Sequence, residues 1–440
     1  MKKLLMLFLA AVLVLPAFAA CSDEKEPAVN IRPEDGTETE KEDAAPAVSI
    51  TVDAGSIGGD VYDGAAEAFM ENTGINIIDN SGGNREDADI FFSANGFDIA
   101  WMTENGELVS VDEIRGVYPN YAGNMRNELM SKSLYDGLAY SIPVSGDWAG
   151  LFVNKNVVQE CGITMKGKNY TWSEFLADCE TIKKNGFVPI ACALSEPVNL
   201  WFEYCLLNNG SVYDRLYLLE YYEDDTWDKW TEGFKDLNNL YKKGYFSPEA
   251  ATASGEDEMR LFLDSEAAFM LGNNATLENI VGNADNTDDF IIVFVPAKED
   301  GIGERETSEF IGDLSSGYYI TRSAWDDPEK QAACVEFVTW MTSDEVVSGF
   351  GATRLTALKN GAVEPDGLTA LEKSAVKYVS GASGTATAVQ DRLMLMDDSS
   401  GFMDFLIKVV TGEITAAEAV GILSAENGLD EEDLEEDTEE

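Results

Sequence analysis

Short apolar runs alternate with longer segments of helical periodicity along the first part of the chain. VSITVDAG (48–55) has the pattern of a strand, and GDVYDGAAEAFMENTG (59–74) places apolar residues at helical spacing before Gly74. Apolar positions three and four apart indicate one helix face, and glycine commonly ends a helix. INIID predicts a second strand, and ADIFFSA (88–94) predicts a strand buried on both faces. This alternation predicts an α/β layered fold.

The same alternation continues to the end of the chain. Thr171 precedes a helical pattern and has Glu174 three residues later, which predicts a capping box. FVPIACAL (187–194) and FIIVFVPA predict strands, and MRLFLDSEAAFMLG predicts a helix that leads into a strand. FDIAWMTENGELVSVDEI (97–114) predicts a helix, a glycine stop and a new extended piece. GYYITRSAWDDPEKQAACVEFVTW predicts a strand, a turn at Asp327-Pro328 and an amphipathic helix.

The first residues have the features of a secretory signal peptide. Lys2 and Lys3 precede an apolar run from Leu4 to Leu15, and small residues stand before Cys21. The run is short for a membrane-spanning helix, so we expect residues 1–20 to be removed. FAAC resembles a bacterial lipobox, in which the cysteine is acylated with a fatty acid such as palmitate. We therefore expect Cys21 to anchor the mature chain to the outer face of the cell membrane. Soluble secretion with an ordinary cysteine is the alternative.

Both ends of the mature chain are rich in charge. Residues 21–47 are rich in acids, Pro, Thr and Ala, a composition that buries too little apolar surface to fold, and we expect a disordered tether. Residues 425–440 form a like-charge run that predicts a solvated acidic tail. A calcium-attracting or partner-binding tail is the alternative.

Composition excludes several functions. The formal charge is −51, and it becomes −53 once Lys2 and Lys3 are lost, so we expect no nucleic-acid partner. The chain has no histidine, which removes the commonest general base and zinc ligand. We expect no metal and no cofactor. Five cysteines remain after Cys21, none in a CxxC pair; buried free thiols are the default, and a disulfide among Cys179, Cys192 and Cys205 is left open.

Several ordered segments resemble one protein family. They are AFMENTGINI, ADIFFS, YDGLAYSIPVSGDWAGLFVNKNVVQECGI, YTWSEFLADCETIKKNGFVPI, EAAFMLG, SGYYITRSAWDDPEKQAACVEFVTWMTSDE and VVTGEITAAEAV. In this order they are similar to the extracellular solute-binding proteins of bacterial ABC transporters. The similarity is to the sugar-binding group that includes the maltodextrin-binding proteins.

The resemblance implies a two-lobed, type II periplasmic-binding-protein-like fold with a ligand cleft between hinged lobes. It places lobe 1 in residues 48–147 and 315–352, and lobe 2 in residues 148–314 and 353–424.

The same resemblance places three crossings between the lobes. They fall near Ser145 to Gly150, Gly312 to Gly317 and Gly349 to Leu358.

Asp147 and Trp148, between two glycines of the first crossing, are the first binding candidates. A sugar site needs aromatic platforms and polar side chains with fixed geometry. By resemblance, Glu196 and Trp201 lie in the loop after the FVPIACAL strand and face the same cleft. The alternative is a place in the core for Trp148 and a structural role for Glu196 and Trp201.

Other candidates come from elsewhere in the chain. Asn95 and Trp101 follow the ADIFFSA strand (88–94). The alternative for Trp101 is a place in the core of a helix. Asp313 stands at the second crossing, and Arg354, near the third, suits a vicinal diol or a carboxylate. By contrast, the spacing of Trp172, Trp325 and Trp340 predicts structural roles.

The chain departs from the family after its Ala-Ala-Met strand. A tryptophan that stacks on sugar often follows there, but FMLGNNATLENI has Asn273 and Asn274. Asn274 is therefore a binding candidate, through amide hydrogen bonds. The departure argues against maltodextrin but leaves the wider class of sugars.

The expected function is a non-catalytic, lipid-anchored receptor that delivers a sugar or oligosaccharide to the permease subunits of an ABC importer. One alternative is the same fold with a polyamine, a peptide or an organic anion as ligand. A surface glycoside hydrolase needs only two suitably spaced carboxylates, but no pair stands out. A purely structural surface lipoprotein is the remaining alternative.

Overall fold

The computed structural model describes residues 48–95, 97–133, 135–195, 198–210, 224–299, 305–386, 388–389 and 399–427. The predicted signal peptide, Cys21, the tether and Glu196 lie outside the described residues. The last helix runs to Asn427, past the predicted start of the acidic tail at residue 425, and residues 428–440 are not described.

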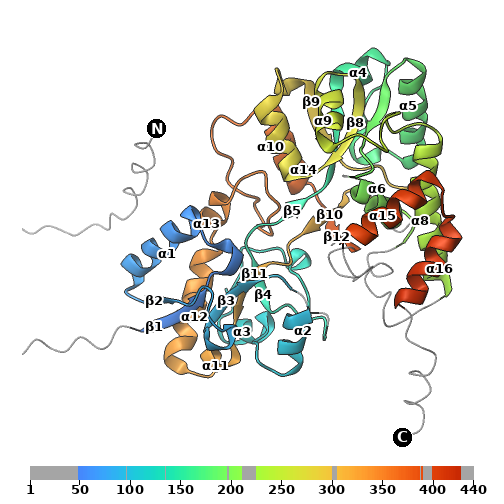
Figure 1. Cartoon of the computed structure of the whole chain (residues 1–440). Helices are drawn as coiled ribbons and strands as arrows, with labels where there is room; N and C mark the ends of the chain where they lie inside the picture. The colour runs from blue at the N-terminus through green and yellow to red at the C-terminus, as the bar shows by residue number, and fades with distance from the viewer. Residues whose placement is uncertain are drawn as a thin grey trace, which may run out of the picture. The chain divides into compact units, whose positions relative to one another are not determined.

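The first sheet combines early and late parts of the chain. Within the described residues it has five strands in the order β2-β1-β3-β11-β4 (Figure 1). The strands are β1 Ser49–Asp53, β2 Asn76–Asp79, β3 Ile90–Ser93, β4 Ser141–Pro143 and β11 Gly317–Ile320. β1 pairs in parallel with β2 and β3, and β11 lies antiparallel between β3 and β4. Ile90, Phe91 and Phe92 of β3 are all buried, as predicted for a strand covered on both faces.

Helices cover this first sheet. They are α1 Asp60–Thr73, α2 Phe97–Glu104, α3 Val111–Val117, α11 Arg322–Trp325, α12 Pro328–Met341 and α13 Asp344–Gly349. α1 ends at Gly74 in the left-handed conformation, φ 73°, which confirms the predicted glycine stop. Phe69 of α1 packs edge-on against Phe337 of α12, with ring centroids 5.3 Å apart. This contact joins two helices that are far apart in the sequence.

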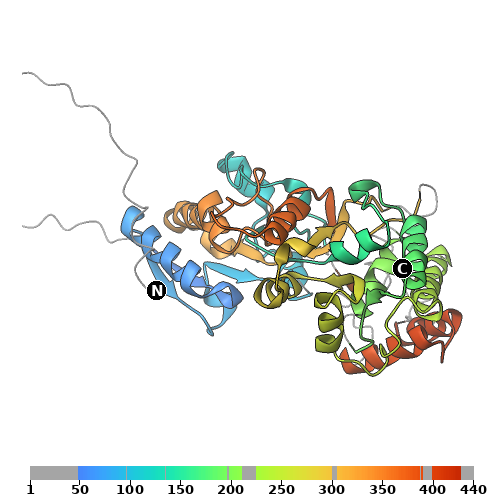
Figure 2. The ribbon, with the colours of Figure 1, turned by 90° about the horizontal axis from the view of Figure 1, so that it is seen from above.

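The second sheet forms from the middle of the chain. In the part of the chain that the structure describes, it has four strands in the order β7-β8-β6-β9. They are β6 Gly150–Asn154, β7 Val188–Ala191, β8 Ala267–Gly272 and β9 Phe290–Val293. The helices of this part are α4 Lys155–Glu160, α5 Trp172–Lys184, α6 Val198–Leu207, α8 Asp224–Lys242, α9 Gly255–Leu263, α10 Asn274–Asn283, α14 Ala370–Ser380, α15 Ser399–Thr411 and α16 Ala416–Asn427. The C-terminal helices α15 and α16 lie against α8 (Figures 1 and 2).

A small third sheet lies where the chain passes between the other two. Its order is β12-β10-β5, with β5 Asp147–Trp148, β10 Glu309–Asp313 and β12 Gly384–Ala386. β5 follows β4 of the first sheet and precedes β6 of the second. β10 precedes β11 of the first sheet.

Local sequence signals account for several element boundaries. The capping box of α5 is confirmed, because the Thr171 side chain accepts the Glu174 N–H and Glu174 binds back to Thr171. The extended piece predicted up to residue 114 is wrong at its end. Val111 begins α3 instead, because the Ser110 hydroxyl accepts the Glu113 N–H and caps a helix there. The three tryptophans expected to be structural, Trp172, Trp325 and Trp340, pack against Phe175, Tyr118 and Phe69, respectively.

All five described cysteines are free thiols. Cys179, Cys192, Cys205 and Cys334 are buried, and Cys161 is half-buried. The default expectation of buried free thiols is therefore confirmed for four of the five.

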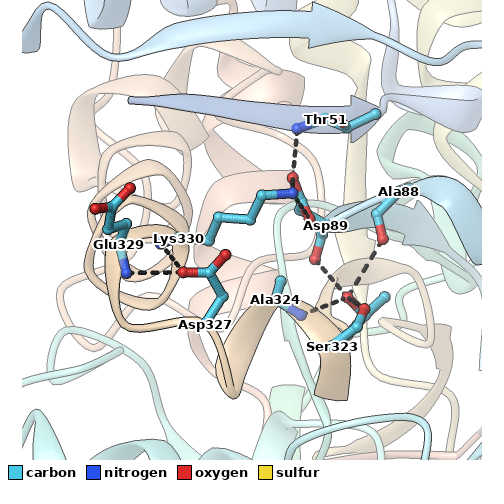
Figure 3. Close-up of polar contacts among 9 residues, drawn as sticks. Thr51, Ala88, Asp89, Ser323, Ala324, Asp327, Glu329 and Lys330 are labelled. Atoms are coloured by element: carbon cyan, nitrogen blue, oxygen red, sulfur yellow. Dashed lines mark hydrogen bonds and ion pairs between the residues drawn. The ribbon is translucent and has the colours of Figure 1, made fainter. Parts of the chain in front are cut away.

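Asp89 is a buried charge that ties the first sheet to α12 (Figure 3). It is 5% exposed, and its carboxylate accepts the Thr51 N–H at 2.8 Å and the Lys330 ammonium at 2.8 Å. The hydrogen bond to Asp89 raises the pKa of Lys330. The Asp89 carbonyl in turn accepts the Thr321 N–H at 3.1 Å.

We expect Lys330→Met to lower the free energy of unfolding by about 1–3 kcal/mol, because it leaves the Asp89 carboxylate buried without its cation. Urea unfolding followed by circular dichroism measures the change. Lys184→Met is the matched control: its pair with Glu180 is exposed, so a change of less than about 0.5 kcal/mol is expected. Equal effects of the two substitutions would contradict the role of Asp89.

Candidate functional site

The three predicted crossing segments lie side by side. Gly146 and Leu355 exchange backbone hydrogen bonds of 2.9 and 3.0 Å, which joins the first segment to the third. β5 and β10 join the first segment to the second, through the antiparallel pairs Trp148–Gly312 and Asp147–Asp313. The backbone of Asp147 thus lies where all three segments meet.

A hollow of about 470 Å³ opens on the first-sheet side of this junction. Its wall is formed by Ser56, Ile57, Gly58, Gly59, Asp60, Val61, Phe92, Ser145, Gly146, Asp147, Ser316, Phe350 and Arg354. The wall therefore combines serine hydroxyls, two carboxylates, one guanidinium and two phenyl rings.

A second hollow, of about 430 Å³, opens on the second-sheet side. Its wall is formed by Asp147, Trp148, Ala149, Asn199, Leu200, Gly255, Met259, Met270, Gly272, Asn273, Ala275, Thr276, Asn279, Ile311, Gly312 and Ala388. Asp147 belongs to both walls, so the two hollows adjoin at this residue. Each volume lies in the range of small-molecule sites.

Asp147 and Arg354 form an ion pair at the junction. Arg354 Nη2 lies 3.0 Å from Asp147 Oδ1. The Arg354 side chain is 35% exposed and the Asp147 side chain is 62% exposed. An exposed pair of this kind contributes little to stability. Both groups therefore remain accessible to a ligand, one as acceptor and one as donor.

Trp148 is buried, at 1% exposure, although it belongs to the wall of the second hollow. Its ring packs on Phe152 and Tyr378, and its indole N–H donates to the Thr353 carbonyl at 2.7 Å. A broad stacking face for a sugar is not available on a ring packed in this way. Trp148 holds the first crossing to the third.

Asn274, like Trp148, links the first crossing to the third. Its Oδ1 accepts the Trp148 N–H at 3.3 Å, and its Nδ2 donates to the Thr353 carbonyl at 3.5 Å. The side chain is buried, at 6% exposure. The geometry therefore makes Asn274 a bridge between two crossings.

The remaining candidates do not gather at the junction. Trp201 is fully buried in α6, where it stacks on Phe175, and Trp101 is 55% exposed on α2; neither belongs to the wall of the two hollows. Asn95 is buried, and its amide donates to Ser131 Oγ at 2.8 Å and to the Lys132 carbonyl. Asp313 contributes its backbone to the pair with Asp147, and its side chain, like Glu196, is not described.

Sequence reasoning missed the polar residues of α10 that face the second hollow. Asn273, Thr276 and Asn279 recur every three residues and all belong to its wall. Asn273 also caps the helix, accepting the N–H groups of Ala275 and Thr276. The sequence signal for this face is the three-residue spacing of polar residues after the Ala-Ala-Met strand.

Glu258 is a buried acidic residue of α9, one of the helices that line the second hollow. Glu258 of α9 accepts the Cys192 N–H at 3.1 Å and the Ser247 hydroxyl. Burial raises the pKa of Glu258, and nearby Glu249 and Asp257 add to the effect. These bonds fasten the segment after β7 to α9, whose residues Gly255 and Met259 line the hollow.

Among the described residues, no group of three or more Cys, Asp or Glu side chains is arranged to hold a metal ion. None of the helices in the described ranges is long and apolar enough to cross a bilayer.

Comparison with known proteins identifies the class. The family model for the bacterial extracellular solute-binding proteins matches residues 50–348, and the chain belongs to this family of solute receptors. No curated protein sequence matches the chain.

Solved structures share the fold. A chitin oligosaccharide binding protein is 17% identical, with 87% of this chain and 98% of that chain covered and a TM-score of 0.62. The solute receptor AcbH, described by its exclusive preference for β-D-galactopyranose, is 16% identical, with coverages of 86% and 97% and a TM-score of 0.69. RafE in complex with raffinose is 16% identical, with coverages of 86% and 98% and a TM-score of 0.57. The chain therefore has the two-lobed fold of type II solute-binding proteins, of family 1.

We expect Trp148→Ala to lower the free energy of unfolding by about 3–5 kcal/mol, because it removes a buried ring. Trp101→Ala is the control, since that side chain is 55% exposed, and a change of less than about 1 kcal/mol is expected. Urea melts of the ligand-free protein measure both. A small loss for Trp148→Ala, equal to that of Trp101→Ala, would show that Trp148 is not held as described.

Proposed function

We propose that this receptor captures a sugar or oligosaccharide between its lobes and delivers it to the permease subunits of an ABC importer. Membership of the solute-binding family supports the receptor role. The structural neighbours named for chitin oligosaccharide, galactopyranose and raffinose support sugar as the ligand class.

The observation that carries the proposal is the Asp147–Arg354 pair at the meeting point of two hollows. A carboxylate accepts hydrogen bonds from neighbouring sugar hydroxyls, and a guanidinium donates to hydroxyl or ring oxygens; such charge-assisted bonds are the strong ones. Because each group already neutralises the other, an uncharged ligand can engage both without leaving a charge unpaired.

The candidate residues divide into two roles in this proposal. Asp147 and Arg354 contact the ligand, with Phe92 and Phe350 as apolar surface in the first hollow. Glu196 and Asp313 stay in the proposed ligand-binding set. Trp148 and Asn274 hold the crossings in place.

The remaining candidates, Trp201, Trp101 and Asn95, are left out of the binding set. Trp201 and Asn95 are buried, and Trp101 is exposed on α2 outside the walls of the two hollows.

We expect Asp147→Asn to weaken sugar binding about tenfold, or about 1.4 kcal/mol, because the neutral amide is a weaker acceptor and no longer pairs with Arg354. A thermal-shift screen of neutral sugars, spermidine and citrate first selects a ligand, since binding only to the folded state raises stability. Calorimetry then compares Asp147→Asn with the exposed control Asp112→Asn on α3.

Two results of this experiment would count against the proposal. If spermidine or citrate alone stabilises the protein, the ligand is not a sugar. Equal affinity of Asp147→Asn and the control would remove Asp147 from the site.

The second part of the proposal is the membrane anchor at Cys21. A lipobox-like FAAC at the end of a signal-peptide pattern supports it. We expect Cys21→Ala to move the protein from the membrane fraction to the medium, because the acylated residue is lost. Fractionation with immunodetection measures this, and mass spectrometry of the mature wild-type N-terminus provides the independent check. An unmodified wild-type N-terminus, or a Cys21→Ala protein that stays with the membrane, would contradict acylation.

A further inference from the structure

The second hollow does not end at the interlobe junction. It shares Gly255, Met259 and Asn279 with a third hollow of about 870 Å³, which lies between α9 and α10. The second and third hollows therefore adjoin at these residues. We call the two together the groove; its lining begins at Asp147, includes Met259 and continues along α9 and α10.

One wall of this groove is a row of three amides and one hydroxyl, called here the amide row. Asn273, Thr276, Asn279 and Asn283 recur three or four residues apart and so lie on one face of α10. The first three line the second hollow, and Asn279 and Asn283 line the third. Asn273, Asn279 and Asn283 are exposed. An amide side chain carries both a donor and an acceptor. Within the row, Asn273 Oδ1 caps the helix and Asn283 Nδ2 donates to Asn279 Oδ1 at 3.1 Å.

The opposite wall is apolar at its centre. Met259 and Leu263 of α9 are four residues apart and half-buried, and Gly255 stands one turn before them. Methionine and leucine at this spacing form a strip that presents C–H surface to the groove. An amide row facing an apolar strip suits a ligand with hydroxyl edges and C–H faces, which is the chemistry of a carbohydrate chain.

The charges of the third hollow restrict the ligand further. Its wall carries Glu256, Asp264, Asp285 and Asp289 against one base, Arg260. An excess of carboxylates repels an anionic chain, such as one built from uronic acids.

We propose that the ligand is a neutral oligosaccharide long enough to reach from Asp147 past Met259 to Asn283. This inference rests on the proposed sugar-binding function and specifies the length and charge of the ligand. Its first units occupy the interlobe hollows, and its later units lie along α10. Each further unit in contact with the amide row adds affinity.

Calorimetry with neutral mono- to hexasaccharides of the malto-, cello-, xylo- and chito-series tests the proposal. In the series that binds, the wild-type hexasaccharide affinity is expected to exceed the disaccharide affinity by about tenfold or more. Leu263 and Asn283 line the third hollow and belong to neither of the other two. The double variant Leu263→Ser/Asn283→Ala is therefore expected to lose about fivefold or more for the hexasaccharide and to keep its disaccharide affinity.

Two comparisons separate this inference from the proposed function. Glu278→Ala changes an exposed residue of α10 outside the walls of the three hollows and should leave both affinities unchanged. Asp147→Asn should weaken short and long sugars alike. Equal wild-type affinity for di- and hexasaccharide, or a length gain that survives in the double variant, would overturn the extended groove while sugar binding stands. Failure of every neutral sugar to bind would overturn both.

Discussion

The first crossing is anchored at Ala149, whose carbonyl oxygen accepts two buried hydrogen bonds. This oxygen accepts the hydroxyls of Tyr204 from α6 and Tyr378 from α14, each at 2.6 Å. The Ala149 N–H donates to the Ile311 carbonyl at 2.8 Å, and the Tyr204 hydroxyl accepts the Ile311 N–H at 3.2 Å. The backbone of one residue is thus bonded to two helices and to β10. Hydrogen bonds shielded from water are costly to break, so this residue is held firmly against α6 and α14.

This anchoring explains the division of roles among neighbouring residues. Next to Ala149, Trp148 and Asn274 bind the third crossing through the Thr353 carbonyl and are buried by doing so. One residue earlier, alternation along β5 turns Asp147 the other way, toward Arg354 and the hollows. A buried aromatic ring therefore holds the backbone while the exposed carboxylate beside it remains available for a ligand.

The sequence predicts the features that depend on neighbouring residues. Thr171 with Glu174 caps α5 and Gly74 ends α1, because caps and glycine stops involve only a few consecutive positions. The placement of β11 between β3 and β4 depends on pairing with segments far away in the sequence, such as Gly317 with Ser93 and with Pro143, and no local pattern specifies it. Of the site candidates, the structure brings Asp147, Trp148, Asn274 and Arg354 together. Trp201 instead lies in α6, which is buried around its whole circumference, so a tryptophan there packs into the core.

The free cysteines have a chemical consequence for a protein of an extracellular family. The reactive species in thiol oxidation and disulfide exchange is the thiolate. Burial raises the pKa of Cys179, Cys192 and Cys205 far above the usual value, and also raises that of Cys334. At neutral pH these groups remain protonated and out of reach of oxidants. They behave as small apolar side chains, and an oxidising environment has no route to cross-link them while the fold is intact.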